Sequence, residues 1–600
     1  MYKKIYSIIL FLSFFLVFPL FLFSSEVFEQ ELNTSNSDWT VVSGGKALCK
    51  PQTTSYGFAF LTDGKMLCAV SENGKKLWEK GIEGKNASFL KVFSSDFLLV
   101  VSDKKNISLV NPSGLTLWTK RLSFEIITEP VLGRDSRIFV TGKRSVACFG
   151  VNGICKWKID LEPLKKIAPV EMNDGSIIVF HEKSENNRTS GTRISPFGEI
   201  LETISFAGNV ENSLALPQQG ALLVFSGNGA GLCVVKENQT VTKWAIPSAD
   251  KVFDLCNASL GANFILLKNQ KSALAVAKNS NESRILVFRN SDGFVTDYFD
   301  VPIKYTELSC CESTFDGQNI FISDRKNAIL TTSEGRSVWK GKFPPSNSWN
   351  FCAFTNKNYL VICSNSWVLT GFRTYQRLSS NNANTKKQRQ KATYRNFYNI
   401  NGSVNNLYIF NEKIPSELIG TNRIEVLQEG NYGSKEKEIA SSIISVSNAY
   451  LNFLTTSNTG ARLEKKSAFE TDTTGLGELI VQTGLMGTDE CQNILASIIK
   501  SEDKNVQLYN ALKTVSNFGY DPDGQILNAL DNRRAVTSTS NSYILIELCN
   551  AVYSVCRFMG RPALYKHGMD ILTTLLYPQY DSKIREQARK TLAEIAKLNI

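Results

Sequence analysis

Histidine is the side chain most often used for acid-base catalysis near neutral pH and for binding zinc. This chain of 600 residues has only two, His181 and His567. A Ser-His-Asp triad or a Cys-His pair needs a histidine with partners in reach, and neither residue lies in a recognisable motif. Asp and Glu are scattered through predicted turns, so no carboxylate pair for acid-base work stands out. We therefore assign no catalytic residue and no metal ligand.

Two short segments suggest ligand binding at first sight. Asp521-Pro-Asp523-Gly524 resembles part of a calcium loop, but an EF-hand needs a third oxygen ligand before the glycine and a glutamate at the end of the loop. We interpret it as a turn between two helices. Three alternate glycines, at positions 227, 229 and 231, lie between two predicted strands and do not open a helix, which favours a hairpin turn over a phosphate-binding loop.

A repeated pattern predicts the fold of the first two thirds of the chain. Four segments share the form G-x-x-x-W: Gly74 to Trp78, Gly114 to Trp118, Gly153 to Trp157 and Gly335 to Trp339. In each, the glycine suits a tight hairpin turn and the tryptophan falls on the last strand of a longer unit. The first three tryptophans are 40 and 39 residues apart, which is the length of a four-stranded propeller blade.

Weaker copies fill the interval before the fourth segment. Residues 193–206 keep the turn glycine, residues 232–244 keep Trp244, and residues 285–299 offer Tyr298 as the aromatic residue. A last unit, residues 359–376, has strands but no docking tryptophan. This makes eight candidate blades between residues 39 and 380, or seven if one weak copy is an insertion.

At these residues the sequence resembles the quinoprotein-like family of β-propellers, which is built from pyrroloquinoline-quinone-type repeats. The resemblance covers a little over half of the chain, and BamB-like propellers are closest in size. It implies an all-β propeller whose blade-docking residues are the glycines and tryptophans of the four segments, together with Trp244. Since a blade cannot bury both faces alone, we expect these tryptophans to fill the space between blades and not to bind ligands. The alternating segment from Trp39 to Val42 is the candidate strand for closing the ring.

The adjacent residues Cys310 and Cys311 could indicate cofactor binding, because the large quinone dehydrogenases of this family carry an adjacent-cysteine disulfide against the cofactor. The resemblance stops there. Those propellers are longer than residues 39–380, and their calcium ligands lie on insertions for which this chain has no room. The pair also suits an ordinary strand, with one side chain on each face. We predict no cofactor and leave the disulfide state of the pair open.

The N-terminus has the order of a secretory signal: Lys3 and Lys4, an apolar run over residues 5–23, then Ser24 and Ser25. Residues 1–25 are predicted to be a signal peptide, and an uncleaved signal anchor is the alternative because the run is long enough to span a bilayer. The protein is thus expected to be exported, periplasmic or extracellular. The thirteen cysteines do not follow the spacing of a disulfide scaffold, and we interpret most of them as small buried hydrophobes.

The composition changes after the propeller. Residues 381–433 are polar and basic and are predicted to be a linker. A net charge of +11 is modest for this length, and no nucleic-acid partner is expected. Residues 434–600 follow a helical period, with helices expected at 489–500, 503–517, 541–559 and 562–576. A final helix begins at the N-cap Asp581 and carries Ile584 and Leu592 on one face. This region resembles HEAT-type repeats.

These features predict a multidomain, exported, non-enzymatic scaffold that binds protein partners in the cell envelope. The propeller would hold one partner, and the helical array another or a second copy. A pyrroloquinoline-quinone-dependent dehydrogenase, or another enzyme using the central pocket of the propeller, is the alternative. Contact with a membrane is expected only through residues 5–23, if they are retained. Because the linker is poor in aliphatic residues, the two domains are expected to be separable and mobile.

Overall fold

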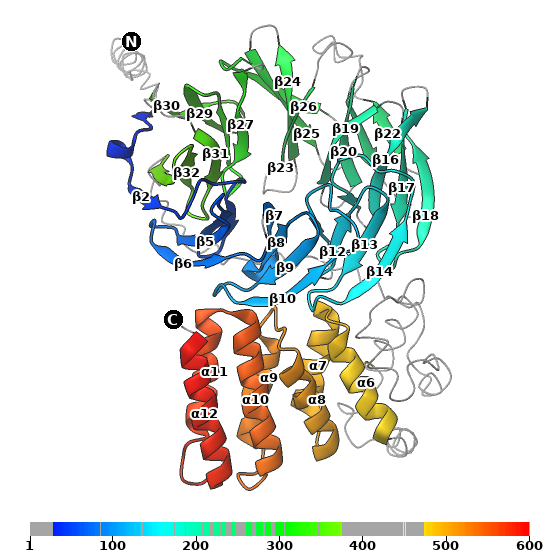
Figure 1. The fold of residues 1–600 in the computed structure, drawn as a ribbon, viewed down its shortest axis with the longest axis vertical. Coiled ribbons are helices and arrows are strands. Elements are labelled where there is room, and N and C mark those ends of the chain that lie inside the picture. The colour runs from blue at the N-terminus through cyan, green and yellow to red at the C-terminus, as the bar shows by residue number, and fades with distance from the viewer. Residues whose placement is uncertain are drawn as a thin grey trace, which may run out of the picture.

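A computed structural model describes residues 28–374 with gaps, of which 235–241 and 246–259 are the longest, and also Asn448, Leu451 and residues 473–598. The predicted signal segment and the predicted linker lie outside the described residues. Within them, the chain forms antiparallel sheets arranged around a ring, followed by α-helices below one side of that ring (Figure 1).

The described residues contain eight sheets, each a candidate blade. Six of them are meanders of four consecutive strands. The first three comprise β3 (Gln52–Thr54), β4 (Gly57–Leu61), β5 (Met66–Ser71) and β6 (Lys76–Gly81); β7 (Ala87–Val92), β8 (Leu98–Ser102), β9 (Asn106–Val110) and β10 (Thr116–Arg121); and β11 (Val131–Leu132), β12 (Ile138–Thr141), β13 (Ser145–Phe149) and β14 (Cys155–Asp160).

The next three comprise β15 (Val170–Glu171), β16 (Ile177–Glu185), β17 (Arg188–Ile194) and β18 (Ile200–Ser205); β19 (Asn209–Leu216), β20 (Gly220–Ser226), β21 (Ala230–Val234) and β22 (Thr242–Ala245); and β23 (Leu260–Leu266), β24 (Ser272–Asn279), β25 (Glu282–Arg289) and β26 (Val295–Val301). The second strands β4, β8 and β12 are buried at every position, as expected for a strand covered on both faces by neighbouring blades.

The last two sheets combine strands from both ends of the propeller. One contains β27 (Cys310–Ser313), β28 (Asn319–Ser323), β29 (Asn327–Thr332) and β30 (Ser337–Lys342), and the other β31 (Trp349–Phe354), β32 (Tyr359–Ser364) and β33 (Val368–Arg373). The strand β2 (Trp39–Val42) pairs antiparallel with β33 and completes that sheet. The strand β1 (Phe28–Glu31) pairs parallel with β30 as a fifth strand. The segment expected to close the ring therefore lies where a closing strand must lie.

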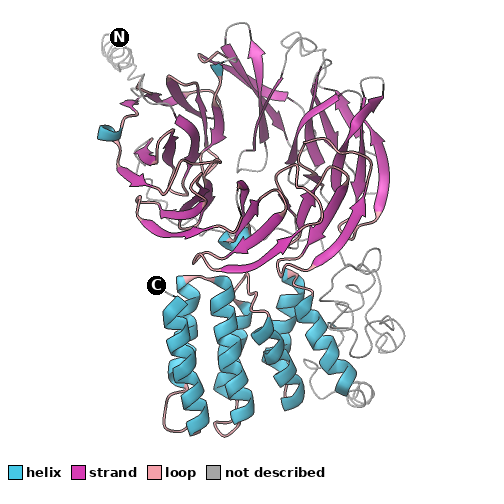
Figure 2. Ribbon diagram, viewed as in Figure 1, coloured by secondary structure: helices cyan, strands magenta, loops and turns pink. Residues whose placement is uncertain are grey.

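The helices form a two-layer array that is distinct from the sheets (Figure 2). One layer contains α6 (Thr473–Leu485), α8 (Asn505–Asn517), α10 (Ser542–Met559) and α12 (Ser582–Leu598), and the other α7 (Asp489–Ser501), α9 (Gln525–Val536) and α11 (Pro562–Thr574). Each helix contacts the next one but one along the chain, which is how stacked helix pairs bury a common core. The predicted class, a propeller followed by a helical domain, is confirmed.

The expectation that the two parts are separable and mobile is corrected by the structure. One buried core runs without a break from the blades β7–β10 and β11–β14 into the helical array. It includes Phe97 and Phe149 from the blades and Phe518, Tyr520 and Met559 from the array. The composition of the linker misled the prediction because loops of the two modules supply apolar docking residues such as Phe97 and Phe518.

Candidate functional site

Each docking glycine that the structure places lies against an aromatic ring of the preceding blade. A Cβ atom built on Gly114 would lie 2.8 Å from the ring of Trp78, and one on Gly153 would lie 2.7 Å from the ring of Trp118. Both glycines have positive φ, so they satisfy the turn and leave room for the ring. The same contact recurs between Gly74 and Trp39, between Gly198 and Trp157, and between Gly335 and Phe299.

The indoles are also fixed by hydrogen bonds to the following blade. Trp118 Nε1 donates to Val151 O at 2.8 Å, and Trp157 Nε1 donates to Pro196 O at 2.9 Å. Trp157 and Trp339 are fully buried. A ring that is buried between sheets and whose only donor is satisfied by the backbone has no free face for a ligand.

The weaker repeats offered Tyr298 and Trp244 as docking residues. Tyr298 is not the docking residue of its blade, because its ring is 40% exposed and lies under Arg284, with Cζ 4.7 Å from the ring centroid. The neighbouring Phe299 faces Gly335 instead, since successive side chains of a strand point to opposite faces. Trp244 lies on β22, and its side chain is outside the described part of the structure.

Of the two segments that suggested ligand binding, residues 521–524 and the glycines at 227–231, the first has a structural role. Asp521 accepts hydrogen bonds from the backbone of Ile526 and Leu527, which caps the start of α9. Burial raises the pKa of this carboxyl group, and those backbone bonds oppose the shift. The glycines at 227 and 229 lie outside the described residues, between the paired strands β20 and β21.

The two histidines lie far apart in the chain and in different modules. His181 Nε2 lies 2.7 Å from Thr192 Oγ1, and His567 lies 3.8 Å from an Asp531 carboxylate oxygen. Burial lowers the pKa of His181, although the carboxylate and backbone of Glu162 oppose the shift. Within the described residues, no group of three or more His, Cys, Asp or Glu side chains is arranged to hold a metal ion.

Cys310 and Cys311 point to opposite sides of β27. Cys310 packs against the core shared with the blade closed by β2, whereas Cys311 packs against the core shared with the blade β23–β26. Both are free thiols in the structure. The arrangement is the ordinary strand geometry that we expected as the alternative to a cofactor-facing disulfide.

The joint between propeller and array is the most elaborate polar site among the described residues outside the sheets. The buried carboxylate of Asp489, in the first turn of α7, lies 2.9 Å from Ser136 Oγ and 2.8 Å from the hydroxyl of Tyr520. Ser136 and Tyr520 also lie 2.7 Å from each other. Two further bonds cross the joint, from Asn111 to the carbonyl of Arg557 and from Lys156 to the carbonyl of Met486.

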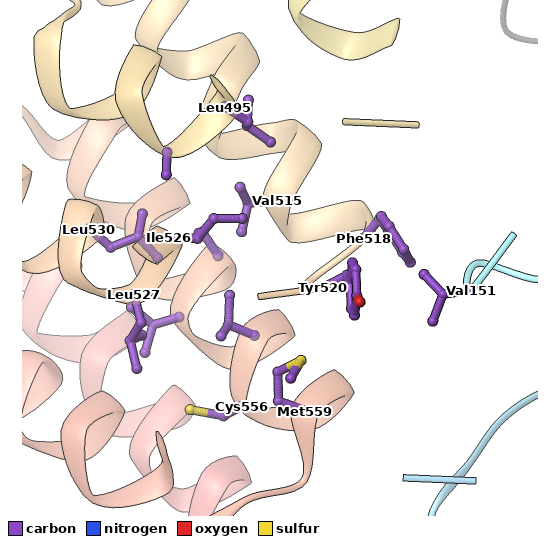
Figure 3. Close-up of a cluster of buried hydrophobic side chains, with 14 of the residues drawn as sticks. Val151, Leu495, Val515, Phe518, Tyr520, Ile526, Leu527, Leu530, Cys556 and Met559 are labelled. Atoms are coloured by element: carbon purple, nitrogen blue, oxygen red, sulfur yellow. The ribbon is translucent and has the colours of Figure 1, made fainter. Parts of the chain in front are cut away.

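Aromatic rings surround this polar cluster. Phe97 approaches Tyr520 and Phe558 with ring centroids 6.4 and 5.7 Å apart, and Phe518 packs edge-on against Phe558 at 5.0 Å. Figure 3 shows Val151 of the propeller next to Phe518 and Tyr520, with core residues of the array, such as Ile526 and Leu530, farther to the left. The rings come from the β7–β8 loop, the α8–α9 loop and the end of α10. The propeller thus covers one end of the helix array.

All four propeller turns at this joint lie at one end of the sheets. Phe97 and Ser136 lie in turns between first and second strands, and Asn111 and Val151 lie in turns between third and fourth strands. In an antiparallel meander, the turns between first and second strands and those between third and fourth strands lie at the same end of the sheet. The array is therefore docked on a single face of the propeller. Sequence reasoning missed these residues, although aromatic residues in otherwise polar loops, as in Phe93-Ser-Ser-Asp-Phe97, gave a usable signal.

On the same face of the propeller, hydrogen bonds also link turns of neighbouring blades. Turns between first and second strands of four successive blades are linked by hydrogen bonds from Asn358 to Asp316 at 2.9 Å, from Asn356 to the Ser55 carbonyl at 2.6 Å, and from the Ser55 backbone to Asp96 at 2.8 Å. These bonds join the closing blades to the blade that carries the array.

Two groups of the exposed large apolar side chains lie away from the joint, one on the closing blade and one at the free end of the array. On the closing blade, Val42 is 62% and Trp367 is 58% exposed, and the backbone of Ser43 bonds to the Trp367 carbonyl. At the far end of the array, Val506 and Tyr543 are exposed, and Tyr543 stacks on Tyr509 at 4.0 Å. We call these groups the closure patch (Val42 and Trp367) and the free-end patch (Val506, Tyr509 and Tyr543).

The fold and the joint define a β-propeller with a helical array docked on one face. The family model described as outer membrane protein assembly factor BamB matches residues 63–247. The resemblance to propellers with pyrroloquinoline-quinone-type repeats is therefore confirmed for that part of the chain. No curated protein matches the chain.

Several solved structures are similar to the propeller. BamB from Moraxella catarrhalis is 10% identical with a TM-score of 0.38, and the match covers 56% of this chain and 99% of that one. Sqt1 from Saccharomyces cerevisiae is 12% identical with a TM-score of 0.40, covering 57% and 100%. A streptogramin B lyase structure is 10% identical with a TM-score of 0.35, covering 56% and 94%.

Proposed function

We propose that this protein is an exported, non-enzymatic scaffold that presents a propeller and a helical array as one rigid platform to protein partners of the cell envelope. The observation that carries the proposal is the continuous core at the joint, which fixes the two modules relative to each other. A partner that contacts both modules would then meet a preformed surface, which lowers the entropic cost of binding. This proposal of a single platform replaces the expectation that two independent modules bind separate partners.

The envelope location rests on two observations. The family model that matches residues 63–247 is described as an outer membrane assembly factor, and the N-terminus has the order of a secretory signal. Among the described residues, no helix has the length and apolar character needed to cross a membrane. Separately, we propose that contact with a membrane is made through residues 5–23, if the signal is not cleaved.

The absence of an assigned catalytic residue follows from the chemistry of the side chains. The feature that favoured a quinone enzyme was the pair Cys310 and Cys311, and these thiols face different blades. Trp78, Trp118 and Trp157 each pack against a turn glycine and donate the indole N–H to a backbone carbonyl. No observation on the described residues favours a dehydrogenase, so we propose no cofactor.

The proposal is tested by site-specific photo-crosslinking in the cells that make the protein. A photoreactive amino acid replaces Trp367 or Tyr543, and Leu77, exposed on the outer strand β6, serves as the control position. We expect discrete adducts with envelope proteins from one or both patches and none from the control. An absence of adducts at both patches, or a quinone absorbance band after incubation of the purified protein with the quinone and calcium, would contradict the proposal.

A further inference from the structure

The strongest unassigned feature is a pair of thiols that face each other across a joint between blades. Cys310 lies on β27 and Cys352 on β31, and these are neighbouring first strands of consecutive blades. Both side chains belong to the same core cluster. Burial raises the pKa of Cys352, and the nearby thiol of Cys310 adds to the shift.

The joint between these two blades is where the ring depends on the N-terminal segment. The blade of Cys310 receives β1 along its outer edge, and the blade of Cys352 is completed by β2. Leu32, between the two added strands, is buried in the same cluster as the thiols. The outer edge of the joint is therefore held by non-covalent strand pairing, and its inner edge carries the cysteines.

We propose that Cys310 and Cys352 form a disulfide that links the two closing blades at the inner edge of the propeller. Two S–H bonds break and one S–S bond forms. The two electrons and two protons pass to a disulfide oxidant, which is reduced to two thiols. The proposal stands on the geometry of the joint, and export matters only because an oxidising compartment supplies such oxidants.

The surroundings fit a structural bond and not a catalytic one. Cys352 is only 2% exposed, and Glu312 lies close enough to raise its pKa further. A thiol that ionises poorly exchanges slowly, so a disulfide here would persist once formed. Cys311 cannot replace Cys310, because its side chain faces the other neighbouring blade, where burial raises its pKa as well.

The test uses the full-length protein, equilibrated with a mixture of reduced and oxidised glutathione and also refolded in that mixture. Remaining thiols are alkylated under denaturing conditions, and the protein is digested with trypsin without reduction. Because Lys357 lies between Cys352 and Cys363, trypsin places these two cysteines in different peptides. We expect the peptide of residues 305–325 to be joined to that of residues 343–357.

Single variants decide which thiols are used. The joined peptide should disappear in Cys310→Ser and in Cys352→Ser and remain in Cys311→Ser. Oxidation should raise Tm by roughly 5–10 °C in the unmodified protein and in Cys311→Ser, and leave it unchanged in Cys352→Ser. A bond between Cys310 and Cys311, or free thiols at both Cys310 and Cys352 after oxidation and after refolding, would overturn the proposal.

Discussion

The glycine–tryptophan contact shows how a single residue type fixes the spacing of blades. Gly153 has φ of +77°, and its missing Cβ leaves the space that the Trp118 ring occupies. The indole N–H then bonds to the backbone of the same turn, at Val151 O. A smaller side chain leaves a cavity and an unpaired carbonyl, and a side chain on the glycine collides with the ring. The repeat therefore needs both residues together.

Replacing Trp157 with alanine should lower the free energy of unfolding by about 3–5 kcal/mol, because a fully buried indole is lost and its space is not refilled. Trp367→Ala is the matched control, since Trp367 is 58% exposed and should leave stability nearly unchanged. Chemical denaturation followed by tryptophan fluorescence and circular dichroism measures both. Equal stability of the two variants would remove the structural role that we assign to Trp157.

His181 should make stability depend on pH. Burial lowers its pKa below the unfolded value of 6.5, so the unfolded chain binds the proton more readily. Its contribution is fully present above pH 6.5 and is lost as the pH falls through the lower, folded pKa. His181→Gln should flatten the decline in Tm between neutral pH and pH 5. A decline that persists unchanged in His181→Gln would contradict the assignment.

The docking residues were readable from the sequence only where the repeat was regular. Gly74 was identified, but its aromatic partner Trp39 comes from the strand that closes the ring and lies outside the G-x-x-x-W pattern. Tyr298 and Phe299 are adjacent aromatic residues, and the choice between them depends on strand register, which the pattern does not specify. Asp489 and Ser136 meet across 353 positions of the chain, and no local signal reports such a contact.

At the scale of elements, β2 shows what ring closure requires. Its Trp39 is enclosed between Gly371 on β33 and Gly74 of the next blade. A Cβ on Gly371 would lie 2.0 Å from Trp39 Cε2. This explains why the last sequence copy has no docking tryptophan of its own: the closing strand supplies Trp39 from the other end of the propeller.

Gly371→Ala should therefore displace Trp39 and weaken closure, at a cost of about 1–3 kcal/mol for overpacking a filled joint. Gly81→Ala is the control, because a Cβ there would meet nothing within 4 Å. Hydrogen exchange should show faster exchange of β2 and β33 amides in Gly371→Ala only. Unchanged protection of these strands would mean that β2 does not depend on this contact.

The helices predicted from the sequence were those with a clear apolar face, and two others among the described residues, α6 and α9, were missed. The helix α6 contains three glycines, which disfavour helix formation, yet Gly484 allows close approach to Thr514 of α8. The helix α9 is polar over much of its length, although Ile526, Leu527 and Leu530 are fully buried. Packing between neighbouring helices, which single-sequence patterns do not contain, decides both.

At the scale of the whole molecule, the joint makes the stability of the array and the propeller interdependent. Glycines end or follow two helices at the joint: Gly560 lies against Asn111 and Gly487 against Asn152, and both have positive φ. Close backbone approach at these points, together with the aromatic core, leaves little room for rotation of one module on the other.

This leads to a prediction about a protein cut between its modules. A site for a specific protease is inserted between Lys386 and Arg395, and the purified protein is cleaved. We expect the two fragments to elute together in size-exclusion chromatography without denaturant, because the buried core and the Asp489 cluster remain intact.

Phe518→Asp places a charge in that core and should let the fragments separate after cleavage. Val536→Asp, 72% exposed at the free end of the array, should not. Circular dichroism of the uncut variants verifies that both are folded. Separation of the cleaved, otherwise unchanged protein would mean that the joint is not a rigid connection and would remove the basis of the single-platform proposal.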